Sequence, residues 1–345
     1  MPSSSTEQDS TAPRIGLALQ GGGAHGAYGW GVIDQLLESG ARIAAVSGAS
    51  AGALNGAALV TGLSEGGPDG ARAALERLWR TIADRSPLRA LDWSPLDTSW
   101  LEPWLGRSFD TAKLAGRYFL PFTPGIADMR TLRTVVADAI DLDRLRDADA
   151  VPLHVSATRV TTGAATIFEG AAITLDALMA SACLPDIFAA VEIDGDLYWD
   201  GGFSANPPLE PLVLDNHVTD LIVAQITPFE GAAPGRDPAS IARRTSDIAF
   251  NAALVRDLAA LTAVQKIARD VVGVDPRLDA LAAMRLHLIA PPGSLLSSSK
   301  LDTRWSQIER LRDLGRHHAA AWLATNGPSI GCRSTLDALP PELAA

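Results

Sequence analysis

The stretch that decides the fold is IAAVSGASAG, residues 43–52. Its first four residues form a short apolar run typical of a strand, and residues 53–63 favour a helix. Between the two stands a Gly-x-Ser-x-Gly pentapeptide with Ser50 at its centre and Gly48 and Gly52 at its ends. A serine at a sharp turn from strand to helix presents its hydroxyl at the carboxyl edge of a sheet. Glycines at the two ends leave room for the strand and the helix to approach each other. This stretch therefore predicts a nucleophile elbow.

A second turn of the same kind lies upstream. A short apolar strand is expected at 15–19 and a helix at 24–39, and Gly21, Gly22 and Gly23 stand between them. The N–H groups of such a turn can face a bound anion, either a phosphate or the oxyanion of an acyl-transfer intermediate. A tight turn without a ligand is the alternative. A dinucleotide site is not favoured, because no clear strand ending in an acidic residue follows about twenty positions later. A P-loop is excluded, because the chain contains no Gly-Lys-Ser/Thr sequence.

The general base is expected to be a carboxylate. None of the six histidines lies in an obvious catalytic loop, whereas Asp200 ends a short strand and is followed by two glycines. Burial beside apolar residues would raise the pKa of this aspartate, which suits a base. Two alternatives remain open. One is a plain Asp-Gly-Gly turn, and the other is a Ser-His-Asp hydrolase that uses His217 or His287.

Taken together, these motifs resemble the patatin-like phospholipases in their order and spacing. The glycine run at 21–26, the pentapeptide around Ser50 and the Asp-Gly-Gly at 200–202 carry the resemblance. The stretches at 181–188 and 206–208 are also similar to that family. The resemblance covers about residues 14–225.

The resemblance implies an α/β fold of three α/β/α layers with a mostly parallel central sheet. It implies a dyad of Ser50 as nucleophile and Asp200 as base. It implies an oxyanion hole made by the N–H groups of Gly22 and Gly23 with help from Gly21. Many members carry Arg or Lys where this chain has His25, so any electrostatic contribution from that position depends on pH here.

The chain is long enough for one compact catalytic domain at 14–345. Its core is expected at 14–225, a helical C-terminal extension at about 236–330, and a Ser/Thr-rich disordered tail at 1–13. Strands are expected at 14–19, 42–47, 151–159, 164–169, 189–193, 197–199, 219–226 and 284–290. Helices are expected at about 129–140 and 304–325, and a long one from Pro238 with an apolar stripe of Leu254, Leu258, Leu261 and Ile267.

An insertion at about 85–125 is rich in aromatic residues. Trp79, Trp93, Trp100 and Trp104 fall close together, and prolines break any long helix. The segment is expected to cap the active site and to favour a long acyl chain or a membrane interface. The alternative is a satellite hydrophobic cluster.

Composition narrows the class further. The net charge of −11 argues against nucleic acid as a partner. Two cysteines make no disulfide framework, and no run approaches the roughly 20 apolar residues of a membrane span. A cytoplasmic protein is expected, with transient contact at a membrane surface and with no metal or cofactor. The sequence does not determine its oligomeric state.

The sequence thus predicts a serine lipid acyl hydrolase that acts on phospholipids or other acyl esters. A thioesterase, an acyltransferase or a polyester hydrolase would use the same residues. A non-catalytic lipid-binding or regulatory protein that keeps the fold is a further alternative.

Overall fold

The computed structural model describes residues 12–86, 129–147, 149–185, 188–215, 218–231, 233–236, 238–293, 300 and 302–336. Their centre is an eight-stranded sheet of order β5-β6-β3-β2-β1-β7-β8, with β4 paired to β3. The strands are β1 (Ile15–Leu19), β2 (Ile43–Ala49), β3 (Leu153–Arg159), β4 (Ala165–Glu169), β5 (Val191–Ile193), β6 (Asp196–Asp200), β7 (Asp220–Ala224) and β8 (Arg285–Ile289). All eight predicted strands are present.

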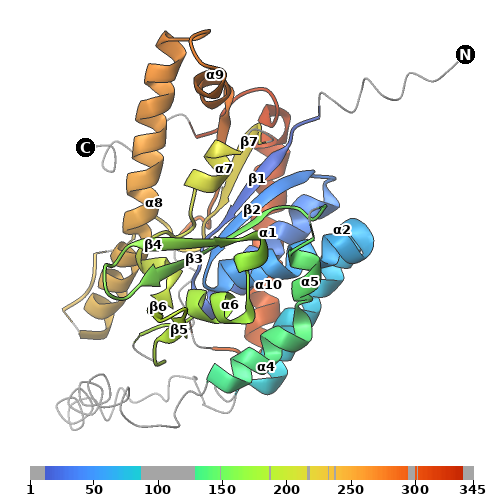
Figure 1. Ribbon diagram of the computed structural model, residues 1–345, viewed down its shortest axis with the longest axis vertical. Coiled ribbons are helices and arrows are strands. Elements are labelled where there is room, and N and C mark those ends of the chain that lie inside the picture. The colour runs from blue at the N-terminus through green and yellow to red at the C-terminus, as the bar shows by residue number, and fades with distance from the viewer. Residues whose placement is uncertain are drawn as a thin grey trace, which may run out of the picture.

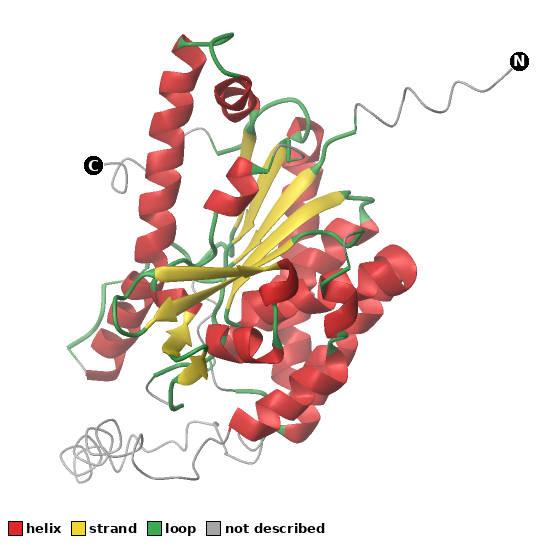
Figure 2. Cartoon of the chain, in the orientation of Figure 1, coloured by secondary structure: helices red, strands yellow, loops and turns green. Residues whose placement is uncertain are grey.

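Helices cover both faces of the sheet and give three layers, as predicted (Figure 1). They are α1 (Gly26–Glu38), α2 (Ala51–Arg85), α4 (Met129–Ala139), α5 (Leu142–Leu145), α6 (Leu175–Ser181), α7 (Glu210–Leu214), α8 (Pro238–Asp270), α9 (Pro276–Ala283) and α10 (Trp305–Asn326). α1, α2 and α10 contact one another on one face, whereas α7, α8 and α9 lie on the other (Figure 1). Strands β3, β2, β1, β7 and β8 are parallel, and β4, β5 and β6 are antiparallel to their neighbours (Figure 2).

The alternation of side chains along β1 explains the two cores. Leu17 and Leu19 belong to the larger core beneath α1, α2 and α10, while Ala18 points to the second core under α7 and α8. A strand buried on both faces must be apolar throughout, and every residue of β1 is buried. The hydrophobic effect therefore fixes β1 in the middle layer.

The strand register brings two distant segments into one row. Ala49 at the end of β2 pairs with Ser156 of β3, and the next residue of β3, Ala157, pairs with Asp200 at the end of β6. Ser50, which follows Ala49, therefore lies in the same row as Asp200 with one strand between them.

Close packing of α1 against α10 explains one glycine in each of these helices. A Cβ at Gly31 would lie 2.0 Å from the carbonyl oxygen of Arg312, and a Cβ at Gly315 would lie 2.1 Å from that of Tyr28. Real Cβ atoms do not approach so closely, so α1 and α10 can cross here only because both positions lack a side chain.

One tryptophan of the predicted cap lies in the long helix α2 instead. Helical structure continues from the elbow to Arg85, with a kink at Gly66 and Gly67. Trp79 lies inside this helix, is only 2% exposed and donates a hydrogen bond from Nε1 to Asn55. Trp79 is therefore a core residue and not part of an aromatic cap. The other tryptophans of the predicted cap, Trp93, Trp100 and Trp104, lie outside the described residues.

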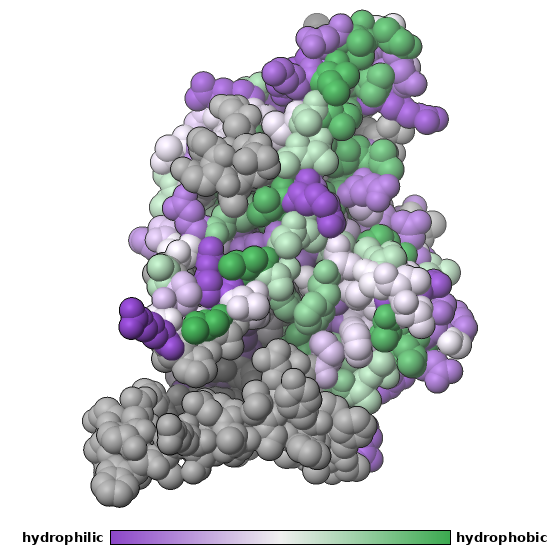
Figure 3. Space-filling view, turned by 90° about the vertical axis from the view of Figure 1, so that its left-hand side faces the viewer, coloured by the Kyte–Doolittle hydropathy of each residue, from purple (hydrophilic) through white to green (hydrophobic). Residues whose placement is uncertain are grey.

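Helix α8 begins at Pro238, and its apolar stripe differs from the predicted one in one residue. Leu254, Leu258 and Leu261 pack into the second core, but Ile267 is 64% exposed. The buried face continues instead through Gln265 and Ala268, because a period of 3.6 residues carries it there from Leu261. Hydrophobic side chains gather at the end of this helix, in the upper part of Figure 3. Among the described residues, no helix has the length and apolar character required to cross a membrane.

Candidate active site

The two glycine-containing turns touch each other at the carboxyl ends of β1 and β2. A Cβ at Gly52 would lie 2.1 Å from the carbonyl oxygen of Leu19, and one at Gly21 would lie 2.6 Å from that of Ala49. A Cβ at Gly48 would lie 2.6 Å from the backbone of Gly52. These glycines are therefore required for contact between the turns, and the contact brings the glycine loop against the serine.

Ser50 forms the turn between β2 and α2 with a left-handed φ of 53°. This conformation is energetically unfavourable for a residue other than glycine, and it is typical of strained functional turns. Its side chain lies at the first turn of α2 and is largely buried. Its N–H has no partner within the helix and donates to Oγ of Ser181 at 2.9 Å.

Asp200 ends β6 and is fully buried. Oδ1 accepts a 2.7 Å hydrogen bond from the N–H of Gly202. Burial raises the pKa of this carboxyl to about 7, against the opposing effects of the Ser50 hydroxyl and the Gly202 amide. Oδ2 makes no hydrogen bond of conventional geometry to a described residue, so the contact with the Ser50 hydroxyl is a loose one. Loose contacts of this kind are common between catalytic groups without substrate.

The three N–H groups of the predicted oxyanion hole are not equivalent. The N–H of Gly21 donates to Oδ1 of Asn206 at 2.7 Å, so this donor is already engaged. No hydrogen bond joins the N–H of Gly22 or Gly23 to another described residue. The oxyanion hole stays a prediction. Because the N–H of Gly21 donates to Asn206, the help expected from Gly21 would come from holding the loop, and the N–H groups of Gly22 and Gly23 are its candidate donors.

A buried polar frame holds the glycine loop. Oε1 of Gln20 accepts from the N–H groups of Ile226 and Thr227, at 2.7 and 2.8 Å, and its Nε2 donates to Asn251 of α8 at 2.8 Å. Nδ2 of Asn206 donates to the carbonyl oxygen of Phe250 at 3.1 Å. Both amide side chains are at most 1% exposed, so their hydrogen bonds are protected from water.

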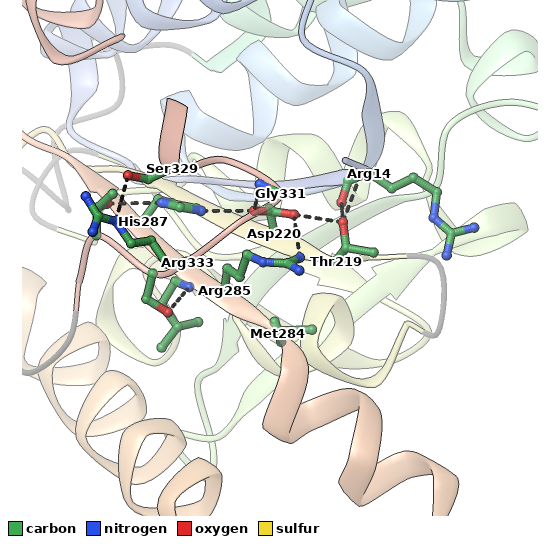
Figure 4. A network of polar contacts seen from close by, with 12 residues as sticks. Arg14, Thr219, Asp220, Met284, Arg285, His287, Ser329, Gly331 and Arg333 are labelled. Carbon is green, nitrogen blue, oxygen red and sulfur yellow. Dashed lines mark hydrogen bonds and ion pairs between the residues drawn. The ribbon is translucent and has the colours of Figure 1, made fainter. Parts of the chain in front are cut away.

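Of the two histidine alternatives, the described structure places His287 away from the serine. His287 is buried in β8, where Nε2 bonds to Oδ1 of Asp220 at 3.1 Å and Nδ1 to Oγ1 of Thr335 at 3.0 Å (Figure 4). Asp220 begins β7 and so lies at the amino edge of the parallel strands, opposite the edge that carries Ser50. His287 therefore belongs to a structural network around Asp220. His217 lies outside the described residues.

Sequence reasoning assigned no role to four residues around the site. Ser181 and Asn206 fall within motifs noted in the sequence, whereas Gln20 and Asn251 stand in no such motif. Their roles rest on hydrogen bonds between segments far apart in the chain, and no local pattern encodes these bonds. Among the described residues, no group of three His, Cys, Asp or Glu side chains could hold a metal ion.

Comparison with known proteins defines the class. The family model described as Patatin-like phospholipase matches residues 17–213, which include both turns and Asp200. The chain therefore belongs to the patatin-like phospholipase family, and a lipid acyl hydrolase is the activity that this family implies.

Particular relatives are distant. The chain is 28% identical over 244 residues to proteins named "Uncharacterized NTE family protein" in Mycobacterium bovis and Mycobacterium tuberculosis. This similarity covers 68% of the chain and 55% of each relative, so the chain spans about half the length of these proteins. Among solved structures, VipD from Legionella pneumophila matches with a TM-score of 0.44 and 16% identity, over 91% of this chain and 67% of that one.

Proposed function

We propose that this protein is a serine lipid acyl hydrolase that cleaves carboxylic ester bonds of phospholipids or other acyl lipids through Ser50 and Asp200. The observation that carries the proposal is a fully buried carboxyl, with a pKa of about 7, next to the hydroxyl of a serine held in a strained elbow. Such a carboxylate is a strong enough base to accept a proton near neutral pH. An aspartate of ordinary pKa would be a poor base there.

The reaction follows from this arrangement in two halves. As Ser50 Oγ attacks the ester carbonyl, its proton passes to Asp200 and the carbonyl oxygen becomes an oxyanion facing the N–H groups of Gly22 and Gly23. The tetrahedral intermediate expels the alcohol, which takes the proton from Asp200, and an acyl-enzyme remains. Water then attacks the acyl-enzyme and gives its proton to Asp200. The acid departs as the proton returns to Ser50, so the enzyme is regenerated.

The glycine loop supports the part of the mechanism in which the oxyanion is stabilised. Backbone donors that are fixed before the reaction stabilise an oxyanion without reorganisation, and loss of one such donor typically costs about 2.7–4 kcal/mol. The polar frame from Gln20 and Asn206 provides this fixation. Because the substrate class is an acyl lipid, we also propose transient contact with a membrane surface.

The experiment compares Ser50→Ala and Asp200→Asn with the unchanged protein in hydrolysis of phospholipids and nitrophenyl esters. We expect both variants to lose activity by at least about 10²–10⁴-fold and to lose labelling by a fluorophosphonate. Ser47→Ala is the matched control, because this buried serine lies three positions upstream and its hydroxyl has no hydrogen-bond partner among the described residues. Wild-type activity in purified Ser50→Ala would refute the proposal.

A panel of substrates separates the related functions that share this chemistry. Thioesters, polyesters and acyl acceptors other than water test a thioesterase, a polyester hydrolase and an acyltransferase. A non-catalytic protein would show neither turnover nor fluorophosphonate labelling of Ser50.

A further inference from the structure

The turn that ends α6 contacts the backbone of both proposed dyad residues. The N–H of Ser50 donates to Oγ of Ser181 at 2.9 Å, and the N–H of Asp200 donates to the carbonyl oxygen of Cys183 at 2.8 Å. The two acceptors are only two positions apart. A single short segment therefore touches the nucleophile on one side and the base on the other.

This contact matters because no hydrogen-bonded strand ladder joins Ser50 directly to Asp200. They follow β2 and end β6, and β3 lies between these strands. Neighbouring strands are about 4.8 Å apart, so the two backbones are separated by roughly twice that distance. β3 pairs with each strand and holds both segments from between them. In the described part of the chain, the end of α6 adds a second connection, because it accepts from the N–H groups of both Ser50 and Asp200.

The conformation of Ser50 also depends on this turn. A positive φ is unfavourable for serine and persists only where the surroundings enforce it. Ser181 is fully buried, so water has no ready access to replace its hydroxyl as the acceptor for the Ser50 N–H. Without that acceptor, rotation of the Ser50 backbone toward an ordinary conformation would move Oγ.

The end of α6 is itself firmly held. Its residues from Ala177 to Ser181 are all buried. Just beyond Ser181, Sγ of Cys183 donates to the carbonyl oxygen of Ala189 at 3.0 Å. The turn can therefore act as a fixed reference for the segments that it contacts.

We propose that Ser181 is a positioning residue that holds the Ser50 hydroxyl against the Asp200 carboxylate. This inference rests on the proposed function, because the dyad of Ser50 and Asp200 is part of that proposal. It assigns to Ser181 an effect on the distance between these two residues and no step of the reaction. It predicts that the hydroxyl at position 181 affects turnover more than substrate binding.

The test is the steady-state kinetics of Ser181→Ala with a nitrophenyl ester across pH. We expect kcat to fall about 10- to 100-fold, since a displacement of about 1 Å can have that effect, with KM unchanged within about threefold. The acidic limb of the pH profile should also move to higher pH, because the Ser50 hydroxyl lowers the pKa of Asp200 and would no longer lie near it. Ser181→Thr keeps an acceptor oxygen and should restore most of kcat and the original limb.

Thr174→Ala is the matched control in the same helix. It removes a hydroxyl that accepts a backbone N–H at the opposite end of α6, so it should lower stability and leave kcat and the pH profile unchanged. If Ser181→Ala does not fold, Ser181→Cys takes its place, because its sulfur is a weaker acceptor of similar size.

The outcomes separate this inference from the proposed function. An active Ser50→Ala variant would overturn both. An inactive Ser50→Ala variant, together with wild-type kcat and pH profile in Ser181→Ala or its Cys substitute, would overturn only the role of Ser181.

Discussion

The N–H of Gly21 donates a 2.7 Å hydrogen bond to Oδ1 of Asn206, a residue 185 positions further along the chain. The same side chain donates from Nδ2 to the carbonyl oxygen of Phe250 in α8. Asn206 therefore links the glycine loop to a helix on the other side of the sheet. The bond also takes Gly21 out of the set of free donors, so the loop presents the N–H groups of Gly22 and Gly23.

Replacement of this link should damage both stability and turnover. Asn206→Ala leaves the buried N–H of Gly21 without an acceptor, which costs about 1–3 kcal/mol in the free energy of unfolding. We expect kcat to fall at least about tenfold, because the oxyanion donors lose their fixed orientation. Denaturant unfolding and ester hydrolysis measure the two effects.

Gln265→Ala is the control for this variant. Gln265 is a buried amide at the far end of α8, and its Nε2 donates to the carbonyl oxygens of Leu281 and Met284. Its loss should lower stability without a change in kcat. Equal kcat in Asn206→Ala and the unchanged protein would contradict the role of the link.

The pH dependence of activity should report Asp200. Its carboxyl must be ionised to accept the serine proton, and its pKa is raised to about 7 by burial. We expect kcat/KM to rise with pH up to about 7 and to level off above it. Rates measured between pH 5 and pH 9 with an uncharged ester test this. A kcat/KM that is already level over this whole range would mean that the pKa of the base is ordinary.

The same pKa predicts that Asp200 destabilises the fold at neutral pH. Below about pH 3.8 the carboxyl is protonated in both the folded and the unfolded chain and has no effect. As pH rises toward 7, the unfolded chain loses this proton first, so folding becomes less favourable, and the penalty is complete above 7. Asp200→Asn should therefore raise the free energy of unfolding at pH 8 by up to about 4 kcal/mol.

That gain should shrink on acidification and vanish below about pH 4. Urea unfolding of both proteins at several pH values measures the difference. Asp200→Asn keeps an oxygen that can accept from Gly202, so its effect is mainly that of removing the charge. A variant less stable than the unchanged protein at pH 8 would count against a carboxyl whose pKa is raised by burial.

The crossing of α1 and α10 should not tolerate a methyl group. Gly315→Ala places a Cβ 2.1 Å from the carbonyl oxygen of Tyr28, so the helices must separate. We expect a loss of about 1–3 kcal/mol, as for other overpacked interiors. Gly327→Ala is the control, because this glycine has helical φ and ψ and no atom within 4 Å of its Cβ position. Thermal unfolding compares the two, and equal melting temperatures would contradict the close crossing.

Much of this protein could be predicted from local patterns. The strands β1 and β7 were recognisable because a strand buried on both faces is mostly apolar, and every residue of both is buried. Ser50 and the glycines of both turns were recognisable because a sharp turn between strand and helix restricts which residues fit. Asp200 stood out as a carboxylate at a strand end before two glycines.

Other predictions failed or remained incomplete where distant segments meet. Trp79 was grouped with an aromatic cap, although α2 continues past it and buries it beside Asn55. Ile267 was placed on the apolar stripe of α8, although α8 packs through Gln265 and Ala268 instead. The help expected from Gly21 stays a prediction, and no local pattern showed that its N–H donates to Asn206.

The sequence by itself determined which residues are candidates for the reactive groups and which elements carry them, because local backbone sterics and hydrophobic periodicity act over a few neighbouring residues. The tertiary structure alone decided how these groups are oriented and charged. Only the complete fold removes water from Asp200 and so raises its pKa, and only the fold brings Ser181 to Ser50 and Asn206 to Gly21. These effects depend on burial and on hydrogen bonds between segments more than a hundred residues apart.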